Sequence, residues 1–237
     1  MKDQQTLKLK TKKEQVNLYK YEEELYDEGY TYVCGVDEAG RGPLAGPVVI
    51  ASCILPPFAR IEGINDSKQL SEKKREELYK QIKRTALDYC VVFIKEKDVD
   101  ELNIYNATKK GMLQAIEGLN KVKPDYVLID AMPLTELETG NKSIVHGDAL
   151  SASIAAASIL AKVERDHYME MMDKKYPNYG FAKHKGYGTK AHFEALAKYG
   201  PCKIHRKTFY PVSKYIAEAK QMSLDLFDDT EDSEDNQ

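Results

Sequence analysis

Residues 32–43 read Tyr-Val-Cys-Gly-Val-Asp-Glu-Ala-Gly-Arg-Gly-Pro. The first five, Tyr32 to Val36, form an apolar and β-prone run that is typical of a buried strand. Two adjacent carboxylates, Asp37 and Glu38, close this run, and a Gly-Arg-Gly loop follows at once. Because glycine lets the backbone approach a ligand closely, the stretch predicts a pair of metal-ligating acids beside a loop that reads an anion or a sugar.

Further strands and helices follow along the chain. Five runs predict strands by their length and β-branching: Tyr32–Val36, Val48–Leu55, Ala86–Ile94, Tyr126–Ile129 and Ser143–Val145. Between them, residues 71–84 carry Leu78 and Ile82 on one helical face, and Met112, Ile116 and Leu119 recur at helical spacing. This alternation predicts an α/β fold with helices on the faces of a sheet.

The second half of the chain predicts mainly helices. Residues 151–163 are built almost wholly from Ala, Ser, Ile and Leu, which predicts a thin helix lying close against the sheet as core. Thr189 can cap a helix that ends near Tyr199, with Gly200 and Pro201 as its stop signal. Pro211 opens a last amphipathic segment.

The length and composition favour one main domain. A chain of 237 residues with 42% hydrophobic content can bury a full core. We expect an N-terminal extension over residues 1–30, either an appended helix or a partly ordered arm, to which we assign no chemistry. The main domain spans residues 31–215 and ends in a small helical part. Residues 216–237 form an acidic tail that we expect to be disordered.

The charge is unevenly distributed. Residues 224–237 carry seven acids and no basic residue, so removing them changes the formal net charge from −3 to +4. A mildly basic body is compatible with nucleic-acid binding without establishing it.

The cysteines and the hydropathy indicate where in the cell the protein works. Four scattered cysteines without a C-x-x-C pair, and no signal peptide, predict buried thiols in a reducing cytoplasm: Cys34, Cys53, Cys90 and Cys202. No apolar run approaches the ~20 residues that a membrane span needs. We therefore expect no membrane partner, and we take a monomer as the default state.

Two later acids complete a set with Asp37 and Glu38. Asp130 follows the strand 126–129, and Asp148 precedes the Ser/Ala-rich helix. Functional groups gather at strand ends in open α/β sheets, and four converging carboxylates need a divalent cation such as Mg²⁺ or Mn²⁺. A two-ion site suits attack of water on a phosphodiester.

Structural alternatives exist for each acid. Asp148 alone is more typical of a helix N-cap, Asp130 alone could start a turn, and Asp37 with Glu38 could form a salt-bridged turn.

Basic and aromatic residues alternate between Lys174 and Lys207, a mixture that suits phosphate contacts and ring stacking. The alternative is a solvated face with buried rings. The five histidines have no zinc-type spacing such as H-E-x-x-H, so we assign no zinc.

Several ordered motifs resemble those of bacterial ribonuclease HII. The resemblance covers roughly residues 32–212 and rests on these segments: 35–48, Asp66-Ser67-Lys68, Leu128-Ile129-Asp130, Gly147-Asp148, 153–163 and His184-Lys185-Gly186-Tyr187-Gly188-Thr189. It implies a ribonuclease H-like fold, which is a mixed five-stranded sheet flanked by helices with a small helical C-terminal part. It also implies endonucleolytic cleavage of RNA in RNA–DNA hybrids.

The resemblance also implies roles for single residues. The metal ligands would be Asp37, Glu38, Asp130 and Asp148, holding Mn²⁺ or Mg²⁺ while water attacks on the 5′ side of a ribonucleotide and leaves 3′-hydroxyl and 5′-phosphate ends. The substrate-binding residues would be Gly40, Arg41, Gly42, Lys68 and Tyr187.

Within that second group, the backbone of residues 40–42 would read the ribose 2′-hydroxyl, which distinguishes RNA from DNA. Tyr187 would stack on the following deoxyribose, and Lys68 would lie near the substrate phosphate. Such a site could act on a single ribonucleotide embedded in duplex DNA. Standing alone, Arg41 could only bridge to a surface acid, Tyr187 could only pack a loop, and Lys68 could be an ordinary exposed lysine.

The tail contains a second motif. Residues 221–227 read Gln-Met-Ser-Leu-Asp-Leu-Phe and resemble the Gln-x-x-Leu-x-Leu-Phe peptide with which bacterial replication proteins bind the sliding clamp. The alternative is a last helical turn that packs Leu224 and Phe227 onto the body.

Other functions remain open at this point. A metal-dependent phosphatase or DNA nuclease could use similar carboxylates, and a non-catalytic nucleic-acid or clamp-binding adaptor could use none.

Overall fold

The computed structural model describes residues 17–218 and residue 221. Its centre is a mixed sheet of five strands in the order β3-β2-β1-β4-β5. The strands are β1 (Val33–Ala39), β2 (Val48–Ile54), β3 (Asp88–Ile94), β4 (Tyr126–Asp130) and β5 (Gly140–Ile144). β1, β2 and β3 pair antiparallel, whereas β4 runs parallel to both β1 and β5. The predicted α/β architecture with a mixed five-stranded sheet is confirmed.

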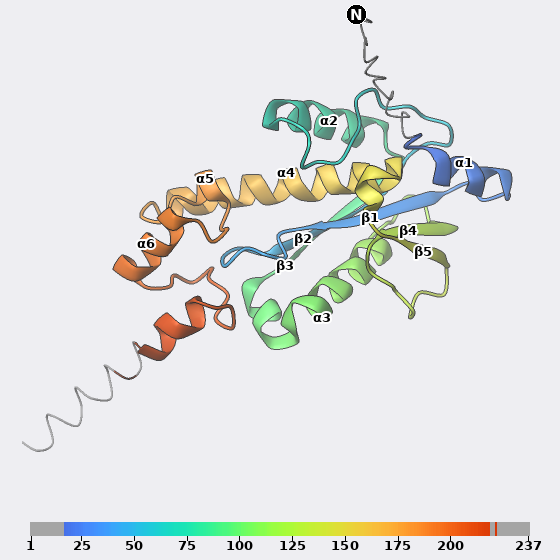
Figure 1. Ribbon diagram of the computed structural model, residues 1–237. Coiled ribbons are helices and arrows are strands. Elements are labelled where there is room, and N and C mark those ends of the chain that lie inside the picture. Colours follow the sequence, from blue (N-terminus) through green and yellow to red (C-terminus); the bar gives the residue numbers. More distant parts are fainter. Residues whose placement is uncertain (1–16, 219–220, 222–237) are drawn as a thin grey trace, which may run out of the picture.

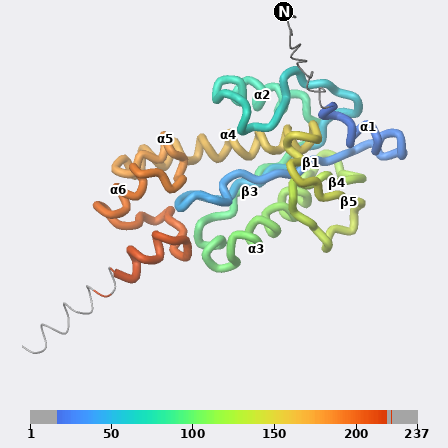
Figure 2. The backbone as a smooth tube through the Cα atoms, viewed as in Figure 1, coloured from blue at the N-terminus to red at the C-terminus, as the bar shows by residue number. Residues whose placement is uncertain are grey.

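Helices cover both faces of this sheet (Figure 1). α4 (Ala152–Lys175) lies along β1 and β2 with α2 (Glu72–Thr85) packed outside it, and α3 (Glu96–Glu117) covers the opposite face. α1 (Lys20–Asp27) precedes β1. α5 (Phe181–His184), α6 (Lys190–Tyr199) and the helical residues 212–218 gather at one end of α4, as the backbone tube in Figure 2 also shows.

Small residues let α4 lie directly on β1. A Cβ atom at Gly35 would overlap the backbone of Ser153 and Ile154, so only glycine allows this approach. Ala155, Ala156 and Ala157 are fully buried on the helix side. The prediction that residues 151–163 form a thin core helix is confirmed for most of its length, and Ser151 provides the N-cap by accepting from the Ile154 N–H at 3.2 Å.

Several element bounds differ from the predictions. β1 continues through Asp37 and Glu38 to Ala39 because these residues still pair with β2. The last strand starts at Gly140 instead of Ser143. It lies at the sheet edge and exposes Lys142 and Ser143, so apolar character could not mark its beginning.

Helix α3 begins earlier than the pattern around Met112 predicted. Its first turns lie before Asn103, whose φ of 65° kinks the helix and breaks the apolar periodicity. The capped helices agree better: Ser71 caps α2, and Thr189 caps α6, which ends at Tyr199.

The N-terminal extension is partly described. α1 is tied to the body through Glu22, whereas residues 1–16 lie outside the described residues, as do 219–220 and 222–237 with most of the predicted tail and clamp motif. Within residues 17–218, no helix is long and apolar enough to cross a bilayer.

All four cysteines are free thiols, but the prediction that all are buried was wrong for two of them. Cys34 and Cys53 lie in the sheet interior. Cys90 and Cys202 are only partly covered, because one faces the end of α3 and the other lies in the C-terminal loop.

Candidate active site

The register of the sheet brings the first and third predicted acids together. In the parallel pair of β1 and β4, Val36 lies opposite Ile129, so Asp37 and Asp130 follow as neighbours at the same end of the two strands. Glu38, one residue further along β1, points to the other face of the pleat from Asp37 but still lines the same pocket. The two carboxylates on the central strand and the one on β4 therefore share one edge of the sheet.

A short turn after β5 brings in the fourth acid. Gly147 donates its N–H to Asp130 Oδ1 at 2.7 Å, which fixes the 3₁₀ turn Gly147–Ala149 against the end of β4. Asp148, 3% exposed, lies in this turn. The alternative that Asp148 caps α4 was wrong, because Ser151 occupies that position.

A pocket of about 210 Å³ opens at this edge. Eight of the nine predicted site residues line it: Asp37, Glu38, Gly40, Arg41, Gly42, Lys68, Asp130 and Tyr187. Asp148 lies just behind, where its Oδ2 accepts from Lys68 Nζ at 3.0 Å. The structure therefore brings all nine residues into one site.

Burial and mutual repulsion raise the pKa values of the acids on β1. For Asp37, burial raises the pKa well above its usual value, and the charges of Glu38 and Asp130 add to the effect, while Ser158 opposes it. For Glu38, burial raises the pKa to about 7 despite the opposing charges of Arg41 and Lys68. The Glu38 N–H also donates to Asp37 Oδ1 at 2.6 Å. These carboxylates are held together at a cost in electrostatic free energy.

The other two acids have specific partners. Burial raises the pKa of Asp130, and Asp148 adds to the shift, while the Gly147 N–H opposes it. Burial is the largest single influence on the pKa of Lys68 and lowers it. The hydrogen bond to Asp148 and the charges of Asp148, Asp37 and Asp66 together outweigh burial, so the net shift is upward. Lys68 thus offsets part of the negative charge of the site, as Arg41 does beside Glu38.

The Gly-Arg-Gly loop presents backbone donors at the pocket. Within the described part of the chain, no protein acceptor takes the N–H of Arg41 or Gly42. The Arg41 guanidinium lies 3.4 Å from Glu38 Oε1. The alternative role for Arg41 was an ion pair with a surface acid. The ion pair is present, but its partner is an acid of the site. Both N–H groups remain available to a ligand.

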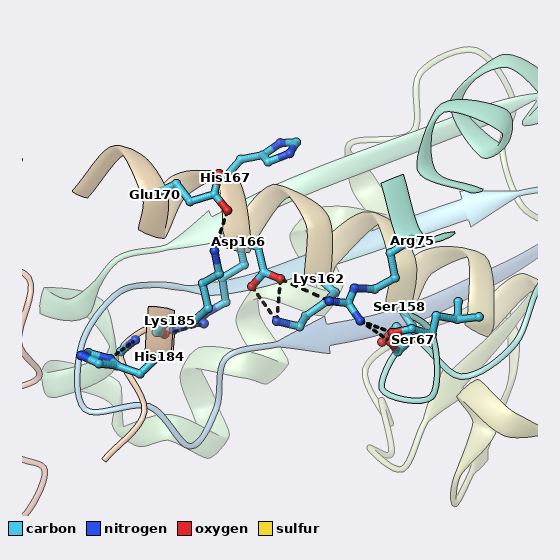
Figure 3. A network of polar contacts seen from close by, with 12 residues as sticks. Ser67, Arg75, Ser158, Lys162, Asp166, His167, Glu170, His184 and Lys185 are labelled. Carbon is cyan, nitrogen blue, oxygen red and sulfur yellow. Dashed lines mark hydrogen bonds and ion pairs between the residues drawn. The ribbon is translucent and has the colours of Figure 1, made fainter. Parts of the chain in front are cut away.

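A row of polar residues on α4 was not predicted from the sequence. Ser158, Lys162 and Arg165 line the pocket although the helix was interpreted as core. Their spacing of four and three residues places them on one helical face, and this polar stripe in an otherwise apolar helix was the signal that could have identified them. Figure 3 shows the network beyond them, with Lys162 donating to both oxygens of Asp166 and Arg75 lying between Asp166 and the loop of Ser67.

The C-terminal part supports Tyr187. Its ring, 46% exposed, lies with its centroid 5.9 Å from the Arg165 guanidinium carbon. Its backbone carbonyl accepts from His192 Nδ1 at 2.9 Å, and His192 Nε2 lies 3.0 Å from His205 Nε2. Since His205 Nδ1 accepts from the Cys202 N–H at 2.9 Å, this chain of bonds is complete when both rings are neutral and His205 donates to His192.

The basic and aromatic segment of residues 174–207 combines the two arrangements expected for it, namely buried rings and exposed rings that can stack on a ligand. Tyr179 and Phe181 are buried and stack with ring centroids 5.2 Å apart, which makes them the core of the C-terminal part. Tyr187, Phe193 and Tyr199 keep more than a third of their surface exposed. The buried rings thus stabilise the C-terminal part, and among the aromatic residues of this segment Tyr187 lines the pocket.

The donor set suits a hard divalent cation, since carboxylate oxygens are the ligands that Mg²⁺ and Mn²⁺ prefer. As the side chains stand, however, no three His, Cys, Asp or Glu residues in the described part of the chain converge closely enough to hold a metal ion. The hydrogen bonds from Lys68 to Asp148 and from Gly147 to Asp130 occupy oxygens that a cation would need. The chemistry of the ligands fits, and their coordination would require rearrangement.

Comparison with known proteins agrees with this geometry. The sequence profile of Ribonuclease HII matches residues 34–212, which span the sheet, the pocket and the C-terminal part. The chain belongs to the ribonuclease HII family. It is therefore a nuclease of the ribonuclease H type, which hydrolyses phosphodiester bonds.

Individual members of the family show how close this relationship is. Ribonuclease HII of Desulfitobacterium hafniense is 55% identical over 199 residues, which cover 84% of this chain and 76% of that protein. Among solved structures, ribonuclease H2 from Pyrococcus horikoshii has a TM-score of 0.67 at 29% identity, covering 77% of this chain and 96% of that one. Archaeoglobus fulgidus ribonuclease HII, solved in a complex with PCNA, has a TM-score of 0.63 at 25% identity, covering 75% and 95%. The ribonuclease H-like fold expected from the sequence is confirmed.

Proposed function

We propose that this ribonuclease HII hydrolyses the RNA strand of RNA–DNA hybrids and cuts on the 5′ side of single ribonucleotides embedded in duplex DNA. The products would carry 3′-hydroxyl and 5′-phosphate ends. Catalysis would use two ions of Mg²⁺ or Mn²⁺ held by Asp37, Glu38, Asp130 and Asp148.

One observation carries the proposal most directly. A carboxylate cluster and the unpartnered N–H groups of Arg41 and Gly42 line the same pocket. A backbone N–H can donate to a ribose 2′-hydroxyl but finds no such acceptor on deoxyribose, so this pairing supports cleavage chemistry that depends on a ribonucleotide.

The acids would act as ligands because burial first, and repulsion between neighbouring carboxylates second, raise their pKa values, and a bound cation would offset both effects. Ions bound there would supply Lewis-acid stabilisation of the scissile phosphate and activation of the attacking water. The protein's own part is to hold the carboxylates in register on β1 and β4 and to keep the turn with Asp148 against them.

Two exposed side chains would contact the substrate. Lys68, with 73% of its side chain exposed, can move from Asp148 to a phosphate oxygen without breaking any packing. The exposed ring of Tyr187 offers a flat surface to the sugar of the next nucleotide, and Arg165 and His192 hold that residue in place. These contacts support recognition of an RNA-to-DNA junction.

The decisive experiment uses two labelled duplexes that differ in one 2′-hydroxyl. We expect the full-length protein with Mg²⁺ or Mn²⁺ to cut the duplex that contains one ribonucleotide, 5′ of that nucleotide, and to leave the all-DNA duplex intact, with no cutting in EDTA. Cutting of both duplexes would instead favour a metal-dependent DNA nuclease and refute recognition of the 2′-hydroxyl.

A matched variant separates the enzyme from an adaptor. Asp130→Asn keeps the shape of the side chain and its acceptor for the Gly147 N–H. We expect it to bind the ribonucleotide duplex like the wild type and to lose turnover. Unchanged turnover would argue that the acids are structural. Family membership favours the enzyme over a non-catalytic adaptor.

A second proposal concerns the tail. We propose that residues 221–227 dock on a bacterial sliding clamp, which is supported by the Gln-x-x-Leu-x-Leu-Phe pattern and by the solved complex of a relative with PCNA. A peptide of residues 219–229 should bind the clamp, and a peptide with Gln221→Ala and Phe227→Ala should not. Equal binding by both peptides would refute this proposal.

Two further expectations concern the state of the protein. We propose that it works as a monomer in the cytoplasm. The four free cysteines support the reducing compartment. Light scattering of the purified protein would report the oligomeric state.

A further inference from the structure

Arg206 is the largest charged group buried next to the candidate active site without reaching the pocket. It is fully buried. Its guanidinium donates from Nε to the Gly46 carbonyl at 3.0 Å, from Nη1 to the Arg41 carbonyl at 2.8 Å, and from Nη2 to the carbonyls of Gly40 and Gly46 at 2.5 and 2.8 Å. All four bonds end on one loop, residues 40–46.

Nothing neutralises this charge directly. Within the described residues, Arg206 forms no ion pair with a carboxylate, and Glu96 and Asp100 act on it only at longer range. Burial, with the nearby Arg165, lowers its pKa to about 9. Burying an unpaired charge is unfavourable, so a side chain that only filled space would be better replaced by an apolar one. The hydrogen-bonding geometry of the guanidinium is therefore the property that this position uses.

The geometry of the peptide bond connects Arg206 to the pocket. In a planar trans peptide, the C=O of one residue and the N–H of the next point in opposite directions. Because Arg206 holds the carbonyl of Gly40, the Arg41 N–H points away from Arg206, and the bond to the Arg41 carbonyl does the same for the Gly42 N–H. These two N–H groups have no protein acceptor among the described residues, and they belong to residues that line the pocket.

The loop cannot hold this orientation by itself. Gly40 has a φ of 97° and Gly46 a φ of 88°, and glycine populates positive and negative φ about equally, so the local sequence alone does not select this conformation. Arg206, in contrast, is fixed by its own backbone: its N–H donates to the Leu44 carbonyl at 2.9 Å, and Gly46 donates to the carbonyl of Ile204 at 2.9 Å. The C-terminal segment thus fixes the position of the loop from the side opposite the pocket.

We propose that Arg206 is a positioning residue that sets selectivity for the ribose 2′-hydroxyl, by holding the carbonyls of Gly40 and Arg41 so that the next N–H groups face the substrate. The proposal rests on the proposed function and adds to it a selectivity determinant 165 positions along the chain from Arg41. Arg206 touches no substrate in this arrangement and acts through the loop.

The test compares two substrates under single-turnover conditions with Mn²⁺. One duplex contains a single ribonucleotide, and the other contains a 2′-fluoro-2′-deoxynucleotide at the same position, which cannot donate or accept as a hydroxyl does. In Arg206→Lys, the charge stays but the planar fork that reaches three carbonyls is lost. We expect the ratio of the two cleavage rates to fall about 100-fold, the loss that a misplacement of about 1 Å produces.

A matched control distinguishes a loss of selectivity from a general loss of stability. Leu119→Ala opens a cavity in the core beyond α3, far from the loop, and destabilises the fold without touching residues 40–46. It should leave the ratio of the two rates unchanged. If Arg206→Lys also leaves that ratio unchanged, with both rates reduced equally, Arg206 is structural only and the proposal is refuted.

Chemical rescue provides a second readout. In Arg206→Ala, guanidinium ion at sub-denaturing concentration can occupy the vacated site, so it should restore cleavage of the ribonucleotide duplex relative to an equal concentration of sodium chloride. Restoration of the 2′-fluoro reaction to the same degree would contradict the proposal. Failure of the wild-type protein to cut the ribonucleotide duplex would instead refute the proposed function itself, so the two failures are distinguishable.

Discussion

Lys68 Nζ lies 3.0 Å from Asp148 Oδ2, so a side chain that is 73% exposed neutralises a carboxylate that is 4% exposed. The pair joins the loop of residues 66–68 to the turn after β5, 80 positions apart. Since Asp148 has no other cation within ion-pair distance in the described residues, Lys68 occupies the place where a metal ion would find an oxygen ligand.

Replacing Lys68 should therefore separate metal binding from substrate binding. We expect Lys68→Met to bind Mn²⁺ about two- to fivefold more tightly, because an exposed ion pair contributes about 0.2–1 kcal/mol and its loss frees Asp148. Titration of Mn²⁺ followed by the electron paramagnetic resonance signal of the free ion would measure this. The same variant should bind duplex with a salt dependence lower by about one phosphate contact. Weaker Mn²⁺ binding would show that Lys68 supports the metal site and does not compete with it.

Relief of repulsion at Asp37 should stabilise the metal-free protein. Asp37 is 3% exposed, and burial with the charges of Glu38 and Asp130 raises its pKa. We expect Asp37→Asn to raise the free energy of unfolding in EDTA at neutral pH by about 0.5–2 kcal/mol, or roughly 2–6 °C in Tm for a chain of this size, while it abolishes cleavage. Glu138→Gln, at an exposed position outside the helices and strands, serves as the control and should change neither quantity. A lower Tm for Asp37→Asn would contradict this account of the site.

The sequence predicted most of this site because its key elements are contiguous. Asp37, Glu38 and the Gly-Arg-Gly loop follow each other directly, and their strand is apolar enough to be recognised. Strand pairing then determines that Asp130 joins them. Lys68 and Tyr187 were predicted as site residues only from the family motifs, because no local sequence pattern identifies them.

What the sequence did not predict depends on contacts between distant segments. Arg206 reads as one more basic residue in a basic segment, and only the fold shows that its guanidinium is buried against residues 40–46. His192 and His205 lack any metal-type spacing, yet their rings meet in the core of the C-terminal part. The edge strand β5 was placed too late because its polar residues face solvent.

The histidine pair should make the fold sensitive to acid. Burial lowers the pKa of both His192 and His205 from 6.5 to about 4. In the unfolded chain each ring binds a proton below about pH 6.5, whereas in the folded protein it does so only near pH 4. Stability from this pair is thus fully present above pH 6.5, declines as the pH falls, and is lost by about pH 4. The decline between pH 7 and pH 5 is on the order of 2 kcal/mol for each ring.

Urea unfolding at pH 7 and pH 5 would measure this decline. Glu22, Asp37 and Glu38 have raised pKa values and act with the opposite sign, so the quantity to compare is the pH dependence of a variant minus that of the wild type. His192→Asn should reduce the decline by about half. Lys190→Gln, an exposed substitution on the same helix that removes no group titrating between pH 5 and pH 7, should leave it unchanged. Equal declines in all three proteins would exclude the pair as the cause.

Glu22 anchors α1 to the start of α4, so substitutions at Glu22 should change the stability of the whole fold. Its Oε1 accepts from Ser151 Oγ at 2.6 Å and from the Ser153 N–H at 2.9 Å, at the start of the helix that carries Ser158 and Lys162. Its Oε2 has no hydrogen-bond partner among the described residues, and burial raises the pKa of the carboxyl.

These two properties predict opposite effects for two substitutions. Glu22→Ala leaves the Ser151 hydroxyl and the Ser153 N–H without an acceptor, and we expect it to lower the free energy of unfolding by about 1–3 kcal/mol. Glu22→Gln keeps an acceptor oxygen and removes the buried charge, so its free energy of unfolding at pH 8 should equal or exceed that of the wild type. Urea unfolding of both variants, with Glu24→Gln on the exposed face of α1 as the control, would decide the matter. A large loss in Glu22→Gln would mean that the charge itself, and not its acceptor oxygen, anchors α1 to α4.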